Sequence, residues 1–133
     1  MKAKNSQYFL KDKKAQIYRE VDGGRDENGF SITGGFYPYA AAPMWCYSKQ
    51  LSQELTFVAM AYDTDETRFF VFNYKPKVKQ YDLILYRGKW YEITRVDTTD
   101  DYKGEMFIYV KDRPRGGIPK DSELQPYDPT KWE

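Results

Sequence analysis

Histidine is missing from the 133-residue sequence, and cysteine occurs only once, as Cys46. Without histidine the chain lacks the Ser/His and Cys/His pairs of common hydrolases and the imidazole ligands of most catalytic zinc sites. One cysteine also excludes an intrachain disulfide, which indicates a reducing compartment. The aspartates at 97–101 lack the spacing and the closing glutamate of a calcium-binding loop. We therefore expect no enzyme, no cofactor and no bound metal ion.

Long apolar runs and an excess of charge of one sign are also missing. No run approaches the roughly 20 apolar residues that span a bilayer, and residues 1–6 lack the apolar region of a signal peptide. The 21 basic and 20 acidic side chains give a net charge of +1. A protein that grips duplex DNA through its phosphates usually carries a clear basic excess. We expect a soluble protein made in the cytoplasm, with no membrane partner and no dedicated binding of duplex DNA.

Aromatic residues, in contrast, make up 18% of the sequence, and 13 of them are tyrosines. Aromatic side chains favour strands, and tyrosine and tryptophan favour interfaces because each is apolar with one polar tip. Apolar and aromatic runs at 67–74, 83–93 and 105–110 are separated by turn residues, which is typical of an antiparallel meander. We predict a mainly all-β fold, a small antiparallel β-barrel of the SH3-like or OB-like kind, with one short helix and extended N- and C-terminal arms.

A hairpin is the clearest local prediction, and it covers residues 83–96. Two alternating runs flank a turn at Gly88, which adopts turn conformations at low cost. Val96 falls out of phase with Ile93, and a bulge at 94–95 would restore the alternation. Bulges of this kind help a sheet to coil into a barrel.

Two earlier strands are predicted at 15–21 and 44–48. Cys46 lies between aromatic residues on the second of them and is best interpreted as a small buried hydrophobe. The glycine-rich segment 22–29 has no Gly-Lys-Ser/Thr end and no following helix, so it indicates turns and not a phosphate-binding loop. A short strand is expected at 30–33.

The segment 50–62 has two interpretations. Four apolar residues recur at helical spacing: Leu51, Leu55, Val58 and Tyr62. With Ser52 as N-cap, this spacing favours a short helix. The alternation from 56 to 62 equally fits a strand.

Extended arms flank the predicted barrel. We divide the chain into an N-terminal arm (1–13), a barrel domain (14–112) with a crossover connection at 49–66, and a C-terminal tail (113–133). Four of the seven prolines lie in the tail, which excludes a regular helix or an inner strand there. The tail also carries apolar residues spaced like anchors: Ile118, Leu124, Tyr127 and Trp132. They would dock either on the chain's own barrel or on a neighbouring subunit, since a purely disordered tail is normally poorer in such residues.

A basic loop interrupts the meander at 75–79. Pro76 has no N–H to donate, so the loop does not continue a central strand. Its lysines are Lys75, Lys77 and Lys79. They either guard a sheet edge in solvent or contact phosphate or an acidic partner, so they join the tail anchors as interface candidates.

The order of these segments is itself informative. A strand with a tryptophan at 44–48 is followed by Glu-Thr-Arg at 66–68 and by an aromatic strand ending in Asn-Tyr at 73–74. A proline loop comes next, then Leu-Tyr-Arg-Gly-Lys-Trp-Tyr-Glu-Ile at 85–93 and a closing strand. This order resembles the head-closure family of tailed bacteriophages, also called head–tail joining, connector or stopper proteins. The resemblance covers residues 16–110.

The resemblance implies a β-barrel subunit of a homo-oligomeric, dodecameric ring in the neck of the virion. Such a ring lies between the portal adaptor and the tail terminator or tail-completion protein, and packaged DNA passes through it without sequence-specific binding. The 49–66 connection is the expected channel or gate segment, unless it simply crosses the barrel. Its polar and acidic candidates are Gln53, Glu54, Asp63, Asp65 and Glu66. Gln53 departs from the family, which commonly has glycine there.

Two other functions compete with this one. A single-stranded nucleic-acid-binding β-barrel would use exposed tyrosine and phenylalanine rings to stack bases. Another neck component, such as a tail-terminator subunit, is the second alternative.

Overall fold

The computed structural model describes residues 10–25, 27–32, 34–51, 66–98 and 104–132. Nine strands and three short 3-10 helices lie in that part of the chain. The strands are β1 (Lys13–Val21), β2 (Gly24–Arg25), β3 (Ser31–Ile32), β4 (Gly35–Pro38), β5 (Met44–Gln50), β6 (Glu66–Asn73), β7 (Leu83–Tyr86), β8 (Lys89–Thr98) and β9 (Glu105–Asp112). The 3-10 helices are η1 (Arg115–Gly117), η2 (Asp121–Glu123) and η3 (Pro129–Trp132). None of these helices has the length and apolar character needed to cross a membrane.

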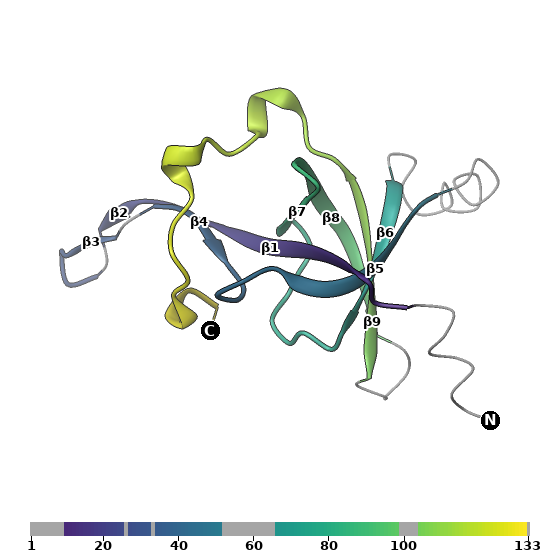
Figure 1. Ribbon diagram of the computed structural model, residues 1–133. Helices are drawn as coiled ribbons and strands as arrows, with labels where there is room; N and C mark the ends of the chain where they lie inside the picture. The colour runs from purple at the N-terminus through teal and green to yellow at the C-terminus, as the bar shows by residue number, and fades with distance from the viewer. Residues whose placement is uncertain (1–9, 26, 33, 52–65, 99–103, 133) are drawn as a thin grey trace.

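Six of the strands close into an antiparallel barrel (Figure 1). The hydrogen-bonded order is β1–β5–β6–β9–β8–β7, and β7 pairs with β1 to complete the ring. β1 reaches three partners because its first residues pair with β5, its middle with β7 and its end with β4. The predicted small antiparallel β-barrel is confirmed. Closure pairs the barrel strands on both sides, which removes the exposed edges of an open sheet.

Apolar side chains fill the barrel interior because inward and outward residues alternate along each strand. Phe70 and Phe72 of β6, Ile93 of β8 and Ile108 of β9 are fully enclosed. The Tyr86 ring meets the Phe70 ring edge-on, with the ring centres 5.3 Å apart. Burying one large apolar side chain stabilises a fold by roughly 1.5–3 kcal/mol, so these positions supply much of the stability of the barrel.

The strand pairing contains two irregularities. One lies in the β8–β9 ladder between Ile93 and Arg95. It brings both Ile93 and Val96 to the core, as the predicted bulge requires, and confirms that prediction. The other lies in the β6–β9 ladder between Glu66 and Arg68, and the alternation of apolar residues gave no sign of it.

The β7–β8 hairpin turns through Arg87 and Gly88. Their φ angles are 51° and 77°, so both residues adopt the left-handed conformation. Two-residue hairpin turns with positive φ at both positions match the natural twist of the paired strands. The predicted hairpin is confirmed.

A second, smaller hairpin projects from the end of β1, away from the barrel (Figure 1). β2 and β3 form it through the pairs Gly24–Ile32 and Arg25–Ser31. The short strand expected at 30–33 is therefore present as β3.

The predicted helix at 50–62 does not begin at Gln50, because β5 extends to that residue. Residues 52–62, the rest of the segment with the helix and strand interpretations, lie outside the described residues.

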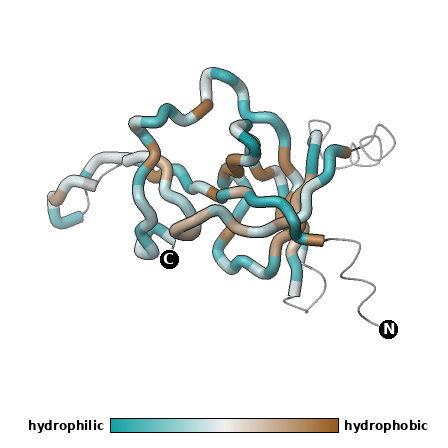
Figure 2. The backbone as a smooth tube through the Cα atoms, in the orientation of Figure 1, coloured by the Kyte–Doolittle hydropathy of each residue, from teal (hydrophilic) through white to brown (hydrophobic). Residues whose placement is uncertain are grey.

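The C-terminal tail leaves β9 and returns across the barrel towards β1 and β4 (Figure 1). The hydrophobic stretches of the chain lie mainly in the strands, whereas the arc of the tail is mostly hydrophilic with short hydrophobic segments (Figure 2). A tail of this composition touches the barrel at separate points.

Candidate functional site

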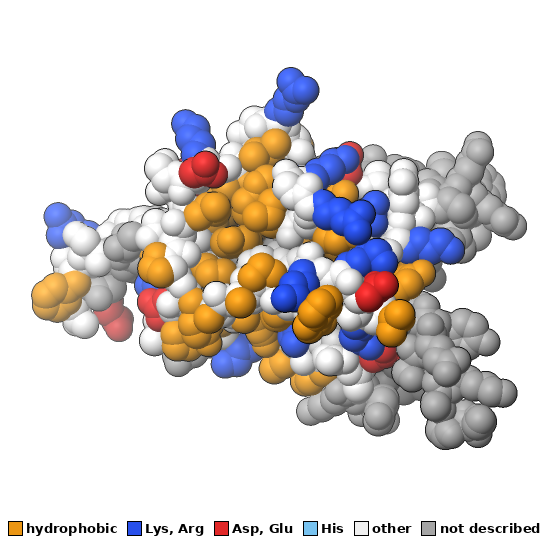
Figure 3. Space-filling view, in the orientation of Figure 1, with side chains coloured by type: hydrophobic (Ala, Val, Ile, Leu, Met, Phe, Trp, Pro, Cys, Tyr) orange, Lys and Arg blue, Asp and Glu red, His pale blue; other side chains and the backbone are white. Residues whose placement is uncertain are grey.

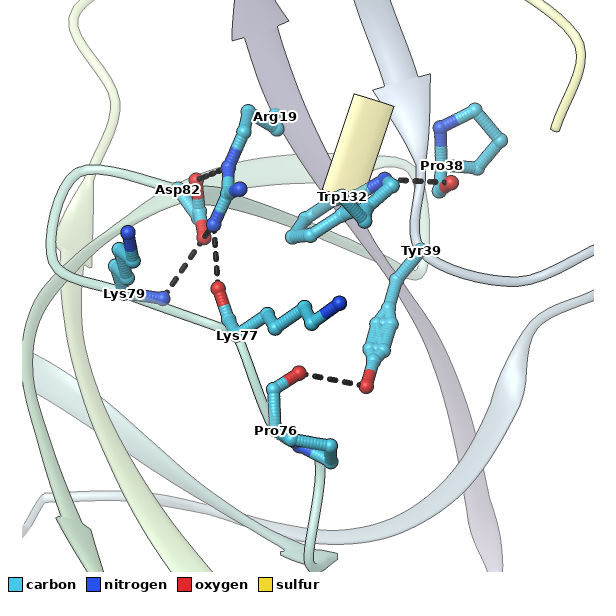
Figure 4. A network of polar contacts seen from close by, with 8 residues as sticks. All are labelled: Arg19, Pro38, Tyr39, Pro76, Lys77, Lys79, Asp82 and Trp132. Atoms are coloured by element: carbon cyan, nitrogen blue, oxygen red, sulfur yellow. Dashed lines mark hydrogen bonds and ion pairs between the residues drawn. The ribbon is translucent and has the colours of Figure 1, made fainter. Parts of the chain in front are cut away.

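Trp132, at the end of the described chain, is the strongest contact point between the tail and the barrel. Its side chain is only 4% exposed and belongs to the main hydrophobic core. The indole Nε1–H donates a hydrogen bond to the carbonyl of Pro38 at 2.9 Å, and the ring packs 4.9 Å from that of Tyr39 (Figure 4). A buried indole normally finds such an acceptor for its N–H. The end of the tail is therefore fixed to the segment that leaves β4.

Arg19 of β1 packs on the ring of the same indole. Its guanidinium lies 4.2 Å from the Trp132 ring centre and forms two hydrogen bonds of 3.0 Å with the buried carboxylate of Asp82. Asp82 also accepts a hydrogen bond from the backbone N–H of Lys79 at 2.8 Å, and Arg19 donates a hydrogen bond to the carbonyl oxygen of Lys77 (Figure 4). Paired, planar hydrogen bonds between arginine and carboxylate fix both groups in orientation. One ion pair thus connects β1, the 75–82 loop and the tail.

Leu124 is the second anchor of the tail. It forms an isolated β-bridge with Phe36 of β4. The backbone N–H of the next residue, Gln125, donates a hydrogen bond to the Phe36 carbonyl at 2.9 Å. Leu124 packs there on a separate cluster that contains Phe36 and Trp90. The close approach needs glycine at position 35, because a Cβ there would lie 2.7 Å from the carbonyl oxygen of Glu123. The tail docks on its own barrel, which answers one of the questions that the sequence left open.

The other two predicted anchors of the tail are exposed to solvent. Ile118 and Tyr127 remain 41% and 45% exposed, respectively. Leu124 and Trp132 contact the barrel of the same chain, which is the first of the two alternatives that the sequence left open. Ile118 and Tyr127 stay available as partner contacts. The sequence could not separate the two pairs, because an apolar residue in a proline-rich tail has no periodic pattern that reveals its facing.

Tyr127 borders an apolar groove of about 490 Å³ between the tail and β1. Its apolar lining consists of Ala15, Tyr18, Pro38, Ala40, Ala41, Pro43, Leu85, Pro126 and Tyr127. The charged residues among the described lining are Lys14 and Arg87, both basic. Figure 3 shows hydrophobic side chains gathered on this face, with lysine and arginine side chains beside them. A groove with this lining is suited to an apolar side chain or segment of another protein.

The lysine loop is firmly held at its base. Val78 is buried in the core, and the Tyr39 hydroxyl donates to the carbonyl of Pro76 at 2.7 Å (Figure 4). Lys77 and Lys79 are exposed, whereas Lys75 is half-buried, and its desolvation lowers the pKa of the ammonium group. Lys77 and Lys79 therefore remain candidates for a partner contact, and a solvated loop remains the alternative.

Glu66 corrects one of the channel predictions. Its side chain is 1% exposed, and the carboxylate accepts two hydrogen bonds from Arg95, at 2.9 and 3.1 Å, and one from Thr94. A buried and paired carboxylate does not form part of an exposed channel wall, so that assignment is wrong for Glu66. The pattern misleads because an acidic residue next to a loop is usually solvated, and nothing local shows that the bulge places Arg95 beside it. The other four channel candidates lie outside the described residues: Gln53, Glu54, Asp63 and Asp65.

Cys46 is fully buried on β5, as the alternating pattern predicted. Burial raises the pKa of its thiol to about 12, so the neutral thiol is the form present near pH 7. Among the described residues, no group of three or more cysteine, aspartate or glutamate side chains is arranged to hold a metal ion.

Comparison with known proteins adds to the account of the fold. No protein-family model matches the chain, and no curated protein matches it either. Among solved structures, the chain is similar to the solution structure of protein SF1141 from Shigella flexneri 2a, with a TM-score of 0.59 and 12% sequence identity. The match covers 77% of this chain and 93% of that protein. At this identity the similarity extends to the small β-barrel fold alone.

Proposed function

We propose that this chain is a structural subunit of a tailed-bacteriophage neck, a head-closure or stopper protein that forms a ring below the portal adaptor. The ring retains packaged DNA in the filled head and provides the platform on which the tail attaches. The subunit is made in the host cytoplasm and resides in the virion at the junction of head and tail. Support comes from the order of segments over residues 16–110 and from the small closed barrel that they form.

The rigid attachment of the tail to the barrel carries the proposal. Trp132 and Leu124 hold the tail in one position, so the groove beside Tyr127 exists before any partner binds. A preformed surface loses less conformational entropy on association than a mobile segment does. An assembly protein needs such a surface to meet the same partner many times around a ring.

A closed ring needs two different patches on each subunit that fit one another. The groove is the first patch, and the second is the β2–β3 hairpin, which projects from the barrel with Phe30 in its turn region (Figure 1). Phe30 is 71% exposed. In the ring that we propose, Phe30 of one subunit enters the groove of the next, because an aromatic ring in an apolar pocket is a common centre of binding energy.

The test of this arrangement is sedimentation velocity of the purified protein, alone and with portal and adaptor. Phe30→Ser should abolish ring formation. Tyr81→Ser removes an equally exposed aromatic ring from the loop before β7 and should leave assembly unchanged. If both variants assemble like the unchanged chain, the Phe30 contact is refuted.

The nucleic-acid alternative has one observation in its favour. The outer face of β5, β6 and β9 carries a cluster of aromatic side chains: Tyr47, Phe69, Phe107 and Tyr109. Their ring centres lie 5.9 to 6.3 Å from that of Phe69. Aromatic rings on an open face of a barrel stack the bases of single strands, with affinity that falls as salt is raised.

Fluorescence anisotropy with a labelled oligonucleotide at low salt separates the two functions. Saturable, salt-sensitive binding lost in Phe69→Ser would favour the nucleic-acid function, whereas absence of binding removes it.

A further inference from the structure

Arg68 lies on the inner side of β6 at one end of the barrel, two residues before Phe70. Its guanidinium packs over the rings of Tyr86 and Tyr91, 5.3 and 5.9 Å from their centres. One of its N–H groups donates to the Ser48 hydroxyl at 2.8 Å. An arginine side chain has five N–H donors, and one of those of Arg68 bonds to a described residue.

Arg68 differs from the other partly buried arginines in the partners that surround it. Three arginines are each paired with an acidic side chain: Arg19 with Asp82, Arg95 with Glu66 and Arg113 with Glu92. No acidic side chain in the described part of the chain forms an ion pair with Arg68. A partly desolvated charge is unfavourable unless an opposite charge or a set of hydrogen bonds compensates it. A carboxylate placed beside Arg68 would compensate its charge.

A pocket of about 160 Å³ opens beside Arg68 at this end of the barrel. β5 ends there with Gln50, β9 ends with Asp112, and Lys89 and Tyr91 come from the start of β8. Pockets that enclose a drug-sized molecule measure roughly 300 Å³ or more. The smaller volume fits a single functional group at the end of a side chain or of a small molecule.

The charges around the pocket indicate the charge of a ligand that would fit it. Lys89 and Asp112 pair with each other at 3.2 Å, and Thr67 donates to the other oxygen of Asp112 at 3.1 Å. Lys89 and Asp112 balance, so Arg68 leaves one net positive charge. A carboxylate carries one negative charge and accepts two parallel hydrogen bonds from a guanidinium. A doubly charged phosphate exceeds the available positive charge and would face the Asp112 carboxylate.

We propose that this pocket binds a carboxylate group, with Arg68 as the residue that receives it. The carboxylate belongs either to an acidic side chain of a second copy of this chain or to a free small carboxylic acid. The inference does not depend on the proposed neck function, since it rests on the pocket and on a guanidinium that has no acidic partner among the described residues.

Nuclear magnetic resonance of the full chain tests the site. Sodium acetate is titrated against sodium chloride at equal ionic strength, and the signals of the Arg68 Nε–H and of the Thr67 and Lys89 amides are followed. Acetate should shift them saturably. Arg68→Lys keeps the charge but loses the planar fork, and should bind acetate about tenfold more weakly. Arg68→Gln should not bind it, whereas Arg115→Gln, which removes an exposed charge elsewhere, should bind normally.

The measurement on the unchanged chain stands even if the variants at position 68 fail to fold. Shifts with acetate that match those with chloride would overturn the proposal, and so would inorganic phosphate binding at least tenfold more tightly than acetate. Sedimentation velocity then identifies the source of the carboxylate. If it comes from a second copy, acetate and Arg68→Gln both reduce self-association while Arg115→Gln does not. If it comes from a free acid, acetate still saturates the pocket and self-association is unchanged.

Discussion

Arg19 and Asp82 form an ion pair with two hydrogen bonds, Nε–Oδ1 and Nη2–Oδ2, each 3.0 Å long. The same guanidinium packs on the indole of Trp132. Through this relationship one side chain of β1 joins a loop 63 residues later in the sequence to the end of the tail. The tail is therefore part of the folded unit, and its stability and that of the barrel are coupled.

Breaking the ion pair tests this coupling. Asp82→Asn removes the charge that compensates Arg19, and we expect a loss of about 1–3 kcal/mol in the free energy of unfolding, less than for a fully buried pair because Arg19 is partly exposed. Urea denaturation followed by circular dichroism measures it. The control is Asp112→Asn, whose pair with Lys89 is solvent-exposed and should be worth less than about 1 kcal/mol. Equal losses in the two variants would contradict the assignment.

Trp132 should contribute to barrel stability despite lying in the tail. Trp132→Ala leaves a cavity in the core and should cost about 3–5 kcal/mol, whereas Trp132→Phe keeps a ring but loses the hydrogen bond to Pro38 and should cost about 1 kcal/mol from that bond. Tyr127→Ala, in the same tail but exposed, is the matched control. The same urea titration ranks them. Trp132→Ala as stable as Tyr127→Ala would show that the tail only rests on the barrel.

Deletion of residues 113–133 tests the same coupling between tail and barrel. If the tail were an arm that only contacts partners, this truncation would leave the barrel folded and impair assembly. Because Leu124 and Trp132 complete the two apolar clusters, the structure leads us to expect that the truncated chain unfolds at a lower urea concentration. A truncated barrel of unchanged stability would show that the tail contributes nothing to the folded unit.

Gly35 should be essential for tail docking. Its φ is 140°, and a Cβ there would approach the Glu123 carbonyl to 2.7 Å. Gly24 has a similar φ of 134°, but a Cβ at that position would meet nothing within 4 Å. Gly35→Ala and Gly24→Ala therefore share the backbone strain, and only the first adds a collision. We expect Gly35→Ala to be the less stable by about 1–3 kcal/mol, measured by thermal unfolding. Equal melting temperatures would mean that the tail does not pack here.

Cys46 should be inert in the native state. Its thiol pKa of about 12 lies above the usual value near 8.5, so folding favours the neutral thiol. The stabilisation is fully present below the unfolded pKa and is lost as pH rises through the folded value. At about pH 8, a disulfide reagent should label Cys46 only at the rate at which the protein opens, because the thiolate is the reactive form. Urea should accelerate labelling. Rapid labelling of the native protein would contradict the buried position.

Much of the fold was predictable because the signals of a strand lie in its own local sequence. Apolar alternation marked the strands, Gly88 marked the hairpin turn, and the mismatch between Ile93 and Val96 revealed the bulge. Each of these signals lies within a few residues of sequence. The bulge also indicated the coiling that helps a sheet to close into a barrel.

The candidate site was far less predictable, because its contacts join distant segments. Nothing near Arg19 in the sequence indicates Asp82 or Trp132, and nothing near Glu66 indicates Arg95. The apolar anchors of the tail were recognised as a set, but not which of them face inward. Long-range ion pairs depend on strand order and register, and these are consequences of the whole fold.

Cryo-electron microscopy of the purified protein mixed with the phage portal and its adaptor tests the central claim most directly. We expect an additional ring below the adaptor, with subunits that match the six-stranded barrel and with the groove beside Tyr127 at the contact between neighbours. A portal–adaptor complex that gains no density when the protein is present in excess would contradict the claim that this chain closes the head.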